Sequence, residues 1–246
     1  MSLGVLMLDT RFPRIPGDVG NPESFDVPVR YRVVHGASPQ RVVRERDRSL
    51  LQPFIDAGRA LVGEGASAIT TSCGFLVLFQ QALQDALPVP VWTSSLLLLP
   101  ELAVRAGPGR VGVLTADAES LSVDHLLAAG VSDQAAIDTP IEGLARGCAF
   151  QRCLLENHTN FDIDDARAAT VDAARRLVTR HPESESIVLE CTNMPWGGVK
   201  FDQSGQNTLG RGILVQIVGG TYHTVYPFNL ATQDVIWPMP KWDQRK

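Results

Sequence analysis

The chain has 246 residues, of which 44% are hydrophobic and 20% are charged, as in an ordinary globular protein. This length is enough for one large domain or two small domains with an extensive core. A formal net charge of -5, with no uninterrupted basic run, argues against a nucleic-acid partner.

The cysteines and the apolar runs exclude several further classes. Four cysteines are too few for the disulfide framework of a secreted protein of this size. Cys148, Cys153 and His158 match no common zinc spacing, so we expect no metal. The N-terminus lacks the pattern of a signal peptide, and the apolar run Leu96–Leu99 is too short to span a membrane. We therefore expect a cytoplasmic protein with no membrane partner.

Strand and helix patterns alternate through the first part of the chain. The apolar run Leu3–Leu8 predicts a buried strand that ends at Asp9, and the segment Thr10–Pro28 predicts an ordered loop. Further strands are predicted over Tyr31–Val34, Ala68–Thr71 and Pro88–Trp92, and helices over Ser49–Val62, Phe75–Leu87 and Ser95–Ala106. This alternation predicts a parallel sheet covered by helices on both faces.

The same order of elements restarts after Gly107-Pro108-Gly109. We expect strands over Arg110–Leu114 and Ser186–Leu189 and helices over Leu121–Ala129 and Asp164–Thr179, while Val131–Phe161 shows no clear period. The fold class is therefore α/β, with two pseudo-symmetric parallel-sheet lobes covered by helices. We assign residues 1–107 to the first lobe and 108–195 to the second.

A cysteine follows one buried strand in each lobe. Cys73 comes after Ala68–Thr71, and Cys191 comes after Ser186–Leu189. Parallel sheets bind ligands at the carboxyl ends of their strands, so the two thiols are expected to face one cleft. A helix N-terminus favours a thiolate, which predicts a pKa for Cys73 below the usual ~8.5. The alternative is that both cysteines are small buried apolar side chains.

Small polar residues surround both cysteines. The backbone amides and side chains that follow the strands are suited to hold a substrate carboxylate, and these residues are Thr71, Ser72, Gly74, Thr192 and Asn193. Their alternative role is helix capping. Asp9 and Thr115 end the first strand of each lobe and are expected to face the same cleft.

These motifs resemble those of the aspartate/glutamate/hydantoin racemase superfamily over about residues 3–195. The segments Thr70–Phe75 and Leu189–Pro195 resemble its two cysteine motifs, and Leu8–Pro13 together with Gly17–Pro22 resembles its N-terminal loop. The resemblance implies that Asn21 and Ser24 bind substrate, although Asn-Pro is also a plain turn signal. It also implies a pseudo-twofold axis that aims both thiols at one substrate.

The resemblance predicts an isomerase that needs no cofactor, namely a racemase of an amino acid or a related small carboxylate. One cysteine removes the proton α to the carboxylate, and the other returns a proton on the opposite face. Two chemistries of the same scaffold remain open: cis–trans isomerisation of an unsaturated diacid and decarboxylation of a malonate. The oligomeric state stays open between a monomer and a homodimer.

The last segment, residues 196–246, departs from this pattern. The runs Ile213–Val218 and Thr221–Tyr226 alternate around Gly219-Gly220, which predicts a β-hairpin. This atypical tail resembles the C-terminal segment of periplasmic branched-chain amino-acid binding proteins. An inactive hybrid joined near Pro195 and a ligand-binding module are therefore two further alternatives.

Overall fold

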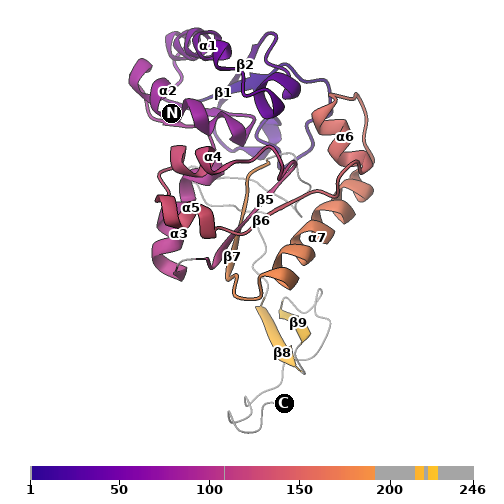
Figure 1. Cartoon of the computed structure of the whole chain (residues 1–246). Helices are drawn as coiled ribbons and strands as arrows, with labels where there is room; N and C mark the ends of the chain where they lie inside the picture. Colours follow the sequence, from indigo (N-terminus) through magenta and orange to yellow (C-terminus); the bar gives the residue numbers. More distant parts are fainter. Residues whose placement is uncertain (1, 108, 192–213, 219–220, 227–246) are drawn as a thin grey trace. The chain divides into compact units, whose positions relative to one another are not determined.

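The computed structural model describes residues 2–107, 109–191, 214–218 and 221–226. The chain divides into two compact units, residues 1–208 and 209–246. The larger unit contains two parallel sheets with their helices (Figure 1).

Four parallel strands form the first sheet in the order β2-β1-β3-β4. These strands are β1 (Leu3–Leu8), β2 (Val29–Val34), β3 (Ala68–Thr71) and β4 (Val91–Trp92). Helix α1 (Leu51–Gly63) packs on β1 and β2, and α2 (Gln80–Ala86) packs on α1. The central strand β1 is buried at every position after Leu3, as its continuous apolar sequence predicts.

Short helical segments form the beginnings of several predicted helices and also occur in the connecting loops. The 3-10 segments are η1 (Pro22–Ser24), η3 (Arg48–Leu50), η4 (Gly74–Phe79) and η5 (Ser95–Leu98), and η2 (Gln40–Arg44) is a π-helical turn. The predicted helix Phe75–Leu87 is therefore η4 followed by α2. The two segments meet at Phe79, whose backbone angles (φ -102, ψ 1) leave the α region.

Three parallel strands form the second sheet in the order β6-β5-β7. They are β5 (Val111–Thr115), β6 (Ile141–Gly143) and β7 (Ser186–Leu189). Helix α3 (Leu99–Ala106) packs on β5 and β7, whereas α7 (Ile163–Arg180) packs on β5 and β6. Figure 1 shows α3 and α7 on opposite sides of this sheet. The α/β fold class with two helix-covered parallel sheets is thus confirmed.

The stretch without a clear sequence period contains three short elements. They are α5 (Asp133–Asp138), β6 and α6 (Ala149–Leu155), and α4 (Val123–Ala128) precedes them. Elements of three to seven residues span at most two helical turns, so they cannot display a repeating apolar pattern.

Apolar contacts join the two sheets into one body. The larger core cluster combines Leu6 and Phe54 of the first sheet's layers with Val113 and Val188 of the second sheet. A second cluster packs Phe12, from the loop after β1, with Leu114 and other residues of the second sheet's layers. Each large side chain buried in this way contributes about 1.5–3 kcal/mol of transfer free energy. The loop that leaves β1 of the first sheet is therefore anchored by Phe12 to the layers of the second sheet.

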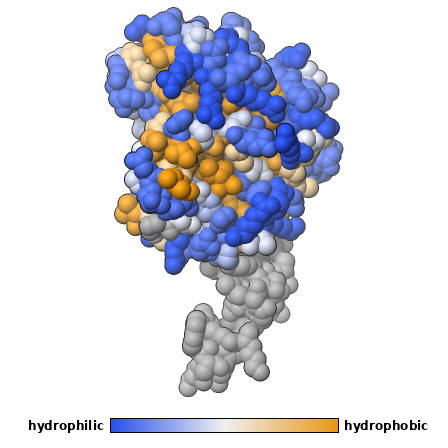
Figure 2. Space-filling view, in the orientation of Figure 1, coloured by the Kyte–Doolittle hydropathy of each residue, from blue (hydrophilic) through white to orange (hydrophobic). Residues whose placement is uncertain are grey.

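Apolar side chains are also exposed on the elements around α3, α4 and α5. They include Leu98, Val104, Leu127 and Ile137, and Figure 2 shows apolar atoms gathered on the corresponding face. Patches of this kind often mark contact surfaces, which is consistent with a homodimer. The homodimer itself stays a prediction. Among the described residues, no helix combines the length and the apolar character needed to cross a bilayer.

The smaller unit contains the predicted hairpin. Strands β8 (Leu214–Val218) and β9 (Thr221–Tyr226) pair antiparallel, with an irregularity between Leu214 and Val215. The predicted junction near Pro195 lies outside the described residues.

Candidate active site

One pocket, partly open to solvent, lies where strands of both sheets end. It is lined by Leu8, Phe12, Arg14, Pro39, Val43, Ser72, Cys73, Gly74, Phe75, Ala116, Leu154, Leu155, Glu190 and Cys191. Ser72 and Cys73 follow β3, and Glu190 and Cys191 follow β7. The pocket therefore occupies the carboxyl edge at which parallel sheets bind ligands.

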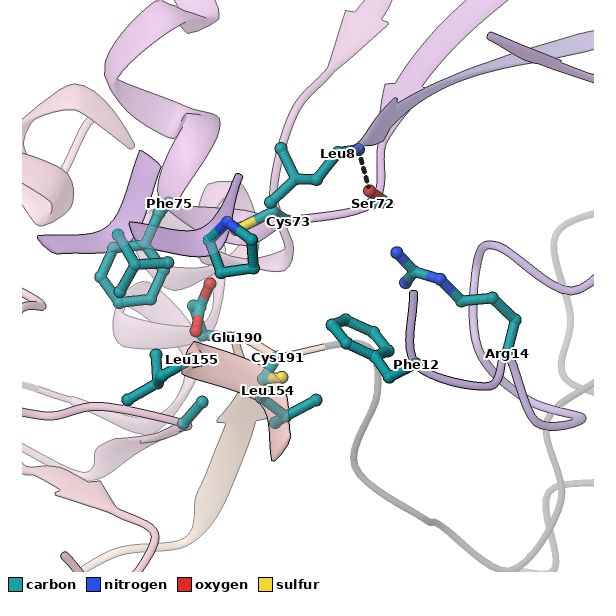
Figure 3. A pocket seen from close by; sticks show the side chains of 14 residues that line it. Leu8, Phe12, Arg14, Ser72, Cys73, Phe75, Leu154, Leu155, Glu190 and Cys191 are labelled. Carbon is teal, nitrogen blue, oxygen red and sulfur yellow. Dashed lines mark hydrogen bonds between the residues drawn. The ribbon is translucent and has the colours of Figure 1, made fainter. Parts of the chain in front are cut away.

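Both predicted cysteines line this pocket and are partly buried (Figure 3). In the same view, Glu190 lies near both cysteines, and Phe12 and Arg14 come from the loop after β1. Cys148 and Cys153 are absent from the described lining. The structure thus brings together the two thiols that the sequence places at equivalent strand ends.

Hydrogen bonds hold the turn that carries Cys73. The Ser72 hydroxyl accepts a hydrogen bond from the backbone N–H of Leu8 at 2.9 Å. The Thr71 hydroxyl donates to the carbonyl of Thr93 at 2.7 Å and contacts the carbonyl of Cys73 at 2.9 Å. These predicted binding residues therefore fix the end of β3, and of the two only Ser72 is among the described lining residues.

Glu190 is a buried carboxylate that the sequence analysis assigned no role. Its side chain is only 1% exposed, and the Thr115 hydroxyl donates a hydrogen bond to its Oε2 at 2.7 Å. The backbone amides of Phe75 and Gly74 also lower the pKa of this carboxylate. Burial nevertheless dominates and raises the pKa of Glu190 from 4.5 to about 7.

The prediction of a lowered pKa for Cys73 is wrong. Burial raises the pKa of the Cys73 thiol strongly, and the negative charge of Glu190 raises it further. The backbone of Phe75 and the charge of Arg14 lower this pKa by smaller amounts. The segment that starts after Cys73 is a six-residue 3-10 turn, so no long helix dipole acts on the sulfur.

The amides after Cys73, which are predicted to hold a substrate carboxylate, face a carboxylate of the protein. The amides of Phe75 and Gly74 lower the pKa of Glu190. Gly74 permits this approach, because a Cβ atom at that position would lie 2.5 Å from Oε1 of Glu190. The two glycine hydrogens thus leave room for a protein side chain from the second sheet.

The loop after β1 delivers a cation that the sequence analysis missed. The Arg14 guanidinium is 3.2 Å from the carboxylate of Asp18 and stacks 4.7 Å from the ring centroid of Phe12. Asn21 donates to the carbonyl of Arg14 at 2.9 Å, and Ser24 donates to the carbonyl of Asp18 at 2.7 Å. Asn21 and Ser24 therefore shape the loop that presents Arg14 to the pocket.

The remaining predicted residues are not among the described lining residues. Asp9 accepts a hydrogen bond from the backbone of Gly36 at 3.0 Å and lies 3.8 Å from His35. Thr115 is fully buried and reaches the pocket only through Glu190. Thr192 and Asn193 lie outside the described residues.

The only sequence signals for the missed residues are their neighbours. Glu190 directly precedes Cys191, and Arg14 lies within the loop segment that resembles the racemase superfamily. Within the described residues, no group of three or more His, Cys, Asp or Glu side chains could hold a metal ion.

The two helix-covered sheets and the pocket at their carboxyl edges define the class of fold. A crystal structure of arylmalonate decarboxylase superposes with a TM-score of 0.50 at 16% sequence identity, over 83% of this chain and 88% of that chain. The chain therefore has the fold of arylmalonate decarboxylase. No family model matches the chain.

Curated relatives share more sequence with the chain. A dimethylsulfoniopropionate lyase from Durusdinium sp. clade D is 33% identical over 204 residues, which are 79% of this chain and 65% of that protein. Dimethylsulfoniopropionate lyase 7 from Emiliania huxleyi is 31% identical over 206 residues, which are 79% of this chain and 59% of that protein. The chain thus spans less than two thirds of the length of these relatives. Their names describe lyases, whereas the sequence motifs led us to expect an isomerase.

Proposed function

We propose that the chain is a cysteine-dependent lyase that acts next to a carboxylate and eliminates a leaving group from the β-carbon. The observation that carries this proposal is the pairing of Cys73 and Cys191 in one pocket at the carboxyl edges of both sheets. The names of the relatives favour dimethylsulfoniopropionate, or a similar sulfonium carboxylate, as the substrate. The proposal keeps the prediction that no cofactor takes part.

The charges of the pocket suit a substrate with one negative and one positive end. Among the described lining residues, Arg14 and Glu190 are the charged side chains. A guanidinium binds a carboxylate through two parallel hydrogen bonds, which makes Arg14 the candidate anchor for the substrate carboxylate. A sulfonium group is attracted by carboxylates and by aromatic faces, and Glu190 and Phe75 supply both.

The proposed elimination uses one base. A thiolate takes the proton from the α-carbon, and the electron pair of that C–H bond forms the double bond between the α- and β-carbons. The bond between the β-carbon and sulfur breaks, and its electron pair stays on sulfur, which leaves as neutral dimethyl sulfide. The other product is acrylate, and the protonated cysteine returns its proton to solvent.

Cys191 is the candidate base. Burial and the charge of Glu190 raise the pKa of Cys73, so Cys73 is a poor source of thiolate at neutral pH. A neutral thiol at Cys73 can still donate a hydrogen bond to the developing carbanion.

Racemisation is the second candidate, because two thiols that line one pocket can serve opposite faces of a substrate carbon. It requires each cysteine to act both as thiolate and as thiol. The raised pKa of Cys73 makes this exchange of roles less favourable than a single proton abstraction.

The two candidates have different products. We expect the purified chain to release dimethyl sulfide and acrylate from dimethylsulfoniopropionate, measured by headspace gas chromatography and by ultraviolet absorbance. Amino acids incubated in deuterated buffer should show no deuterium at the α-carbon. Release of product should be lost in Cys191→Ser, because a serine hydroxyl is a far weaker base.

The matched control is Cys148→Ser. The Cys148 sulfur accepts a hydrogen bond from the backbone N–H of Gln151 at the start of α6, and serine preserves that cap. This variant should keep the rate of the parent chain. Solvent deuterium in an amino acid without any dimethyl sulfide would favour the racemase. If neither dimethyl sulfide nor a deuterated amino acid is formed, the result supports the inactive hybrid.

A further inference from the structure

Glu190 links the two sheets directly beside Cys73. It extends from the residue after β7, yet its Oε1 lies close enough to Gly74 that an added Cβ would be 2.5 Å away. Its Oε2 accepts the hydrogen bond from Thr115, and the side chain is 1% exposed. The carboxylate is therefore held by the Thr115 hydroxyl at one oxygen and lies against Gly74 at the other, and it cannot turn out to solvent without losing the bond to Thr115.

One backbone amide acts on both acidic groups. The amide of Phe75 lowers the pKa of the Cys73 thiol and also that of the Glu190 carboxylate. Glu190 therefore competes with a substrate anion for this amide. A thiolate on Cys73 would have to share this amide with Glu190 and would sit next to a second negative charge.

We propose that Glu190 is a positioning residue that acts through Cys73 and keeps its sulfur as a neutral thiol, so that the two cysteines have fixed and unequal roles. The catalytic consequence of this inference rests on the proposed lyase function. The protonation state of Cys73 can be tested without any substrate. Fixed roles suit elimination, which needs one thiolate. They oppose racemisation, which needs each sulfur in both states.

Other groups around Cys73 and Glu190 do not cancel the effect of the Glu190 charge on the Cys73 thiol. Arg14 faces Cys73 from the loop after β1 and favours its thiolate, but Arg14 is also paired with Asp18 at 3.2 Å. Thr115 faces Glu190 from β5, and the hydroxyl of Ser94 lies against Gly74 from the segment before η5. Both hydroxyls are neutral, so among the described residues Glu190 is the carboxylate that raises the pKa of Cys73. A thiolate on Cys191, in the same pocket, would add a second negative charge and would also favour the neutral thiol of Cys73.

The test is the pH profile of alkylation at Cys73. The full chain is treated with iodoacetamide from pH 6 to pH 11, and the modified fraction of each cysteine peptide is followed by mass spectrometry. The pH midpoint reports ionisation, whereas restricted access changes the rate at every pH. In the parent chain, the Cys73 midpoint should lie above the ~8.5 of an ordinary cysteine.

Glu190→Gln should lower that midpoint by about one to three pH units, the usual effect of removing one adjacent charge. Glutamine keeps the size of the side chain and can still accept from the amides of Phe75 and Gly74. Glu142→Gln is the matched control, because Glu142 pairs with Arg176 and Arg180 and is absent from the described lining of the pocket. It should leave the Cys73 midpoint unchanged.

An equal midpoint in the parent and in Glu190→Gln would overturn the inference. If Glu190→Gln does not fold, Glu190→Asp takes its place, because the shorter side chain moves the negative charge away from Gly74. A lower Cys73 midpoint in that variant supports the inference, and an unchanged midpoint overturns it. Because alkylation uses no substrate, the shift can appear in a chain that releases no dimethyl sulfide. That result would refute the proposed function and leave the role of Glu190 standing.

Discussion

Replacing Glu190 with glutamine should change how the stability of the chain depends on pH. Glu190 is buried, and its pKa in the folded chain is about 7 instead of the ordinary 4.5. Between these two values the unfolded chain loses the proton of Glu190 while the folded chain keeps it. The free energy of unfolding contributed by this group therefore falls as the pH rises from about 4.5 to about 7.

The size of the effect follows from the shift in pKa. One unit of pKa corresponds to about 1.4 kcal/mol, so the shift from 4.5 to about 7 amounts to about 3 kcal/mol. Glutamine does not titrate and escapes this loss. The difference in free energy of unfolding between Glu190→Gln and the parent should therefore grow by about 3 kcal/mol between pH 4.5 and pH 8.

Urea unfolding followed by circular dichroism measures this difference at several pH values and constant ionic strength. Subtracting the parent curve removes the titration of all groups that the two chains share. Glu142→Gln is the contrasting variant, because it removes a carboxylate that forms ion pairs with Arg176 at 3.1 Å and with Arg180 at 2.6 Å. It should destabilise the chain near neutral pH. A Glu190→Gln difference that stays constant from pH 4.5 to pH 8 would refute the reasoning.

Three further outcomes are expected. Gly74→Ala should destabilise the chain by about 1–3 kcal/mol in urea unfolding, because its Cβ would be 2.8 Å or less from three atoms. The control Gly63→Ala, whose Cβ would have nothing within 4 Å, should be neutral or stabilising by up to ~1 kcal/mol. Equal effects of the two substitutions would contradict the crowding at Gly74. Arg14→Gln should raise the KM for dimethylsulfoniopropionate about 10- to 100-fold, because the substrate loses one charged hydrogen-bonding partner. The surface variant Arg105→Gln should leave the KM unchanged. An unchanged KM in Arg14→Gln would exclude Arg14 as the anchor. Asp162→Ala should lower the free energy of unfolding in urea by about 1 kcal/mol, because it removes the N-terminal cap of α7. The rate of dimethyl sulfide release should stay at the parent value. A lower rate would show that the cap of α7 affects the active site.

The sequence by itself determined the strands that carry the cysteines. The predicted runs Leu3–Leu8, Ala68–Thr71 and Ser186–Leu189 match β1, β3 and β7 residue for residue. Such strands are buried by helices on both faces of a parallel sheet, so each appears as a short apolar run that ends in polar residues. The position of Cys73 and Cys191 after β3 and β7 follows from this local pattern and from the direction of parallel strands.

Other elements depended on contacts that a local pattern does not contain. The predicted helix Phe75–Leu87 begins instead as the 3-10 segment η4, in which five of six residues are buried. The segments α5, β6 and α6 are stabilised by packing on neighbouring layers, and they are too short for their own periodicity to identify them.

Only the tertiary structure decided the chemistry of the site. Glu190 stands beside Cys191 in the sequence, but its effect falls on Cys73, because folding places its carboxylate against Gly74 and Thr115. Arg14 likewise reaches the pocket because Asp18 and Asn21 hold its loop. The pKa of an ionisable group depends on its burial and on the charges near it in space. Those neighbours come from distant parts of the chain, so the order of residues predicted where the thiols lie but not which of them ionises.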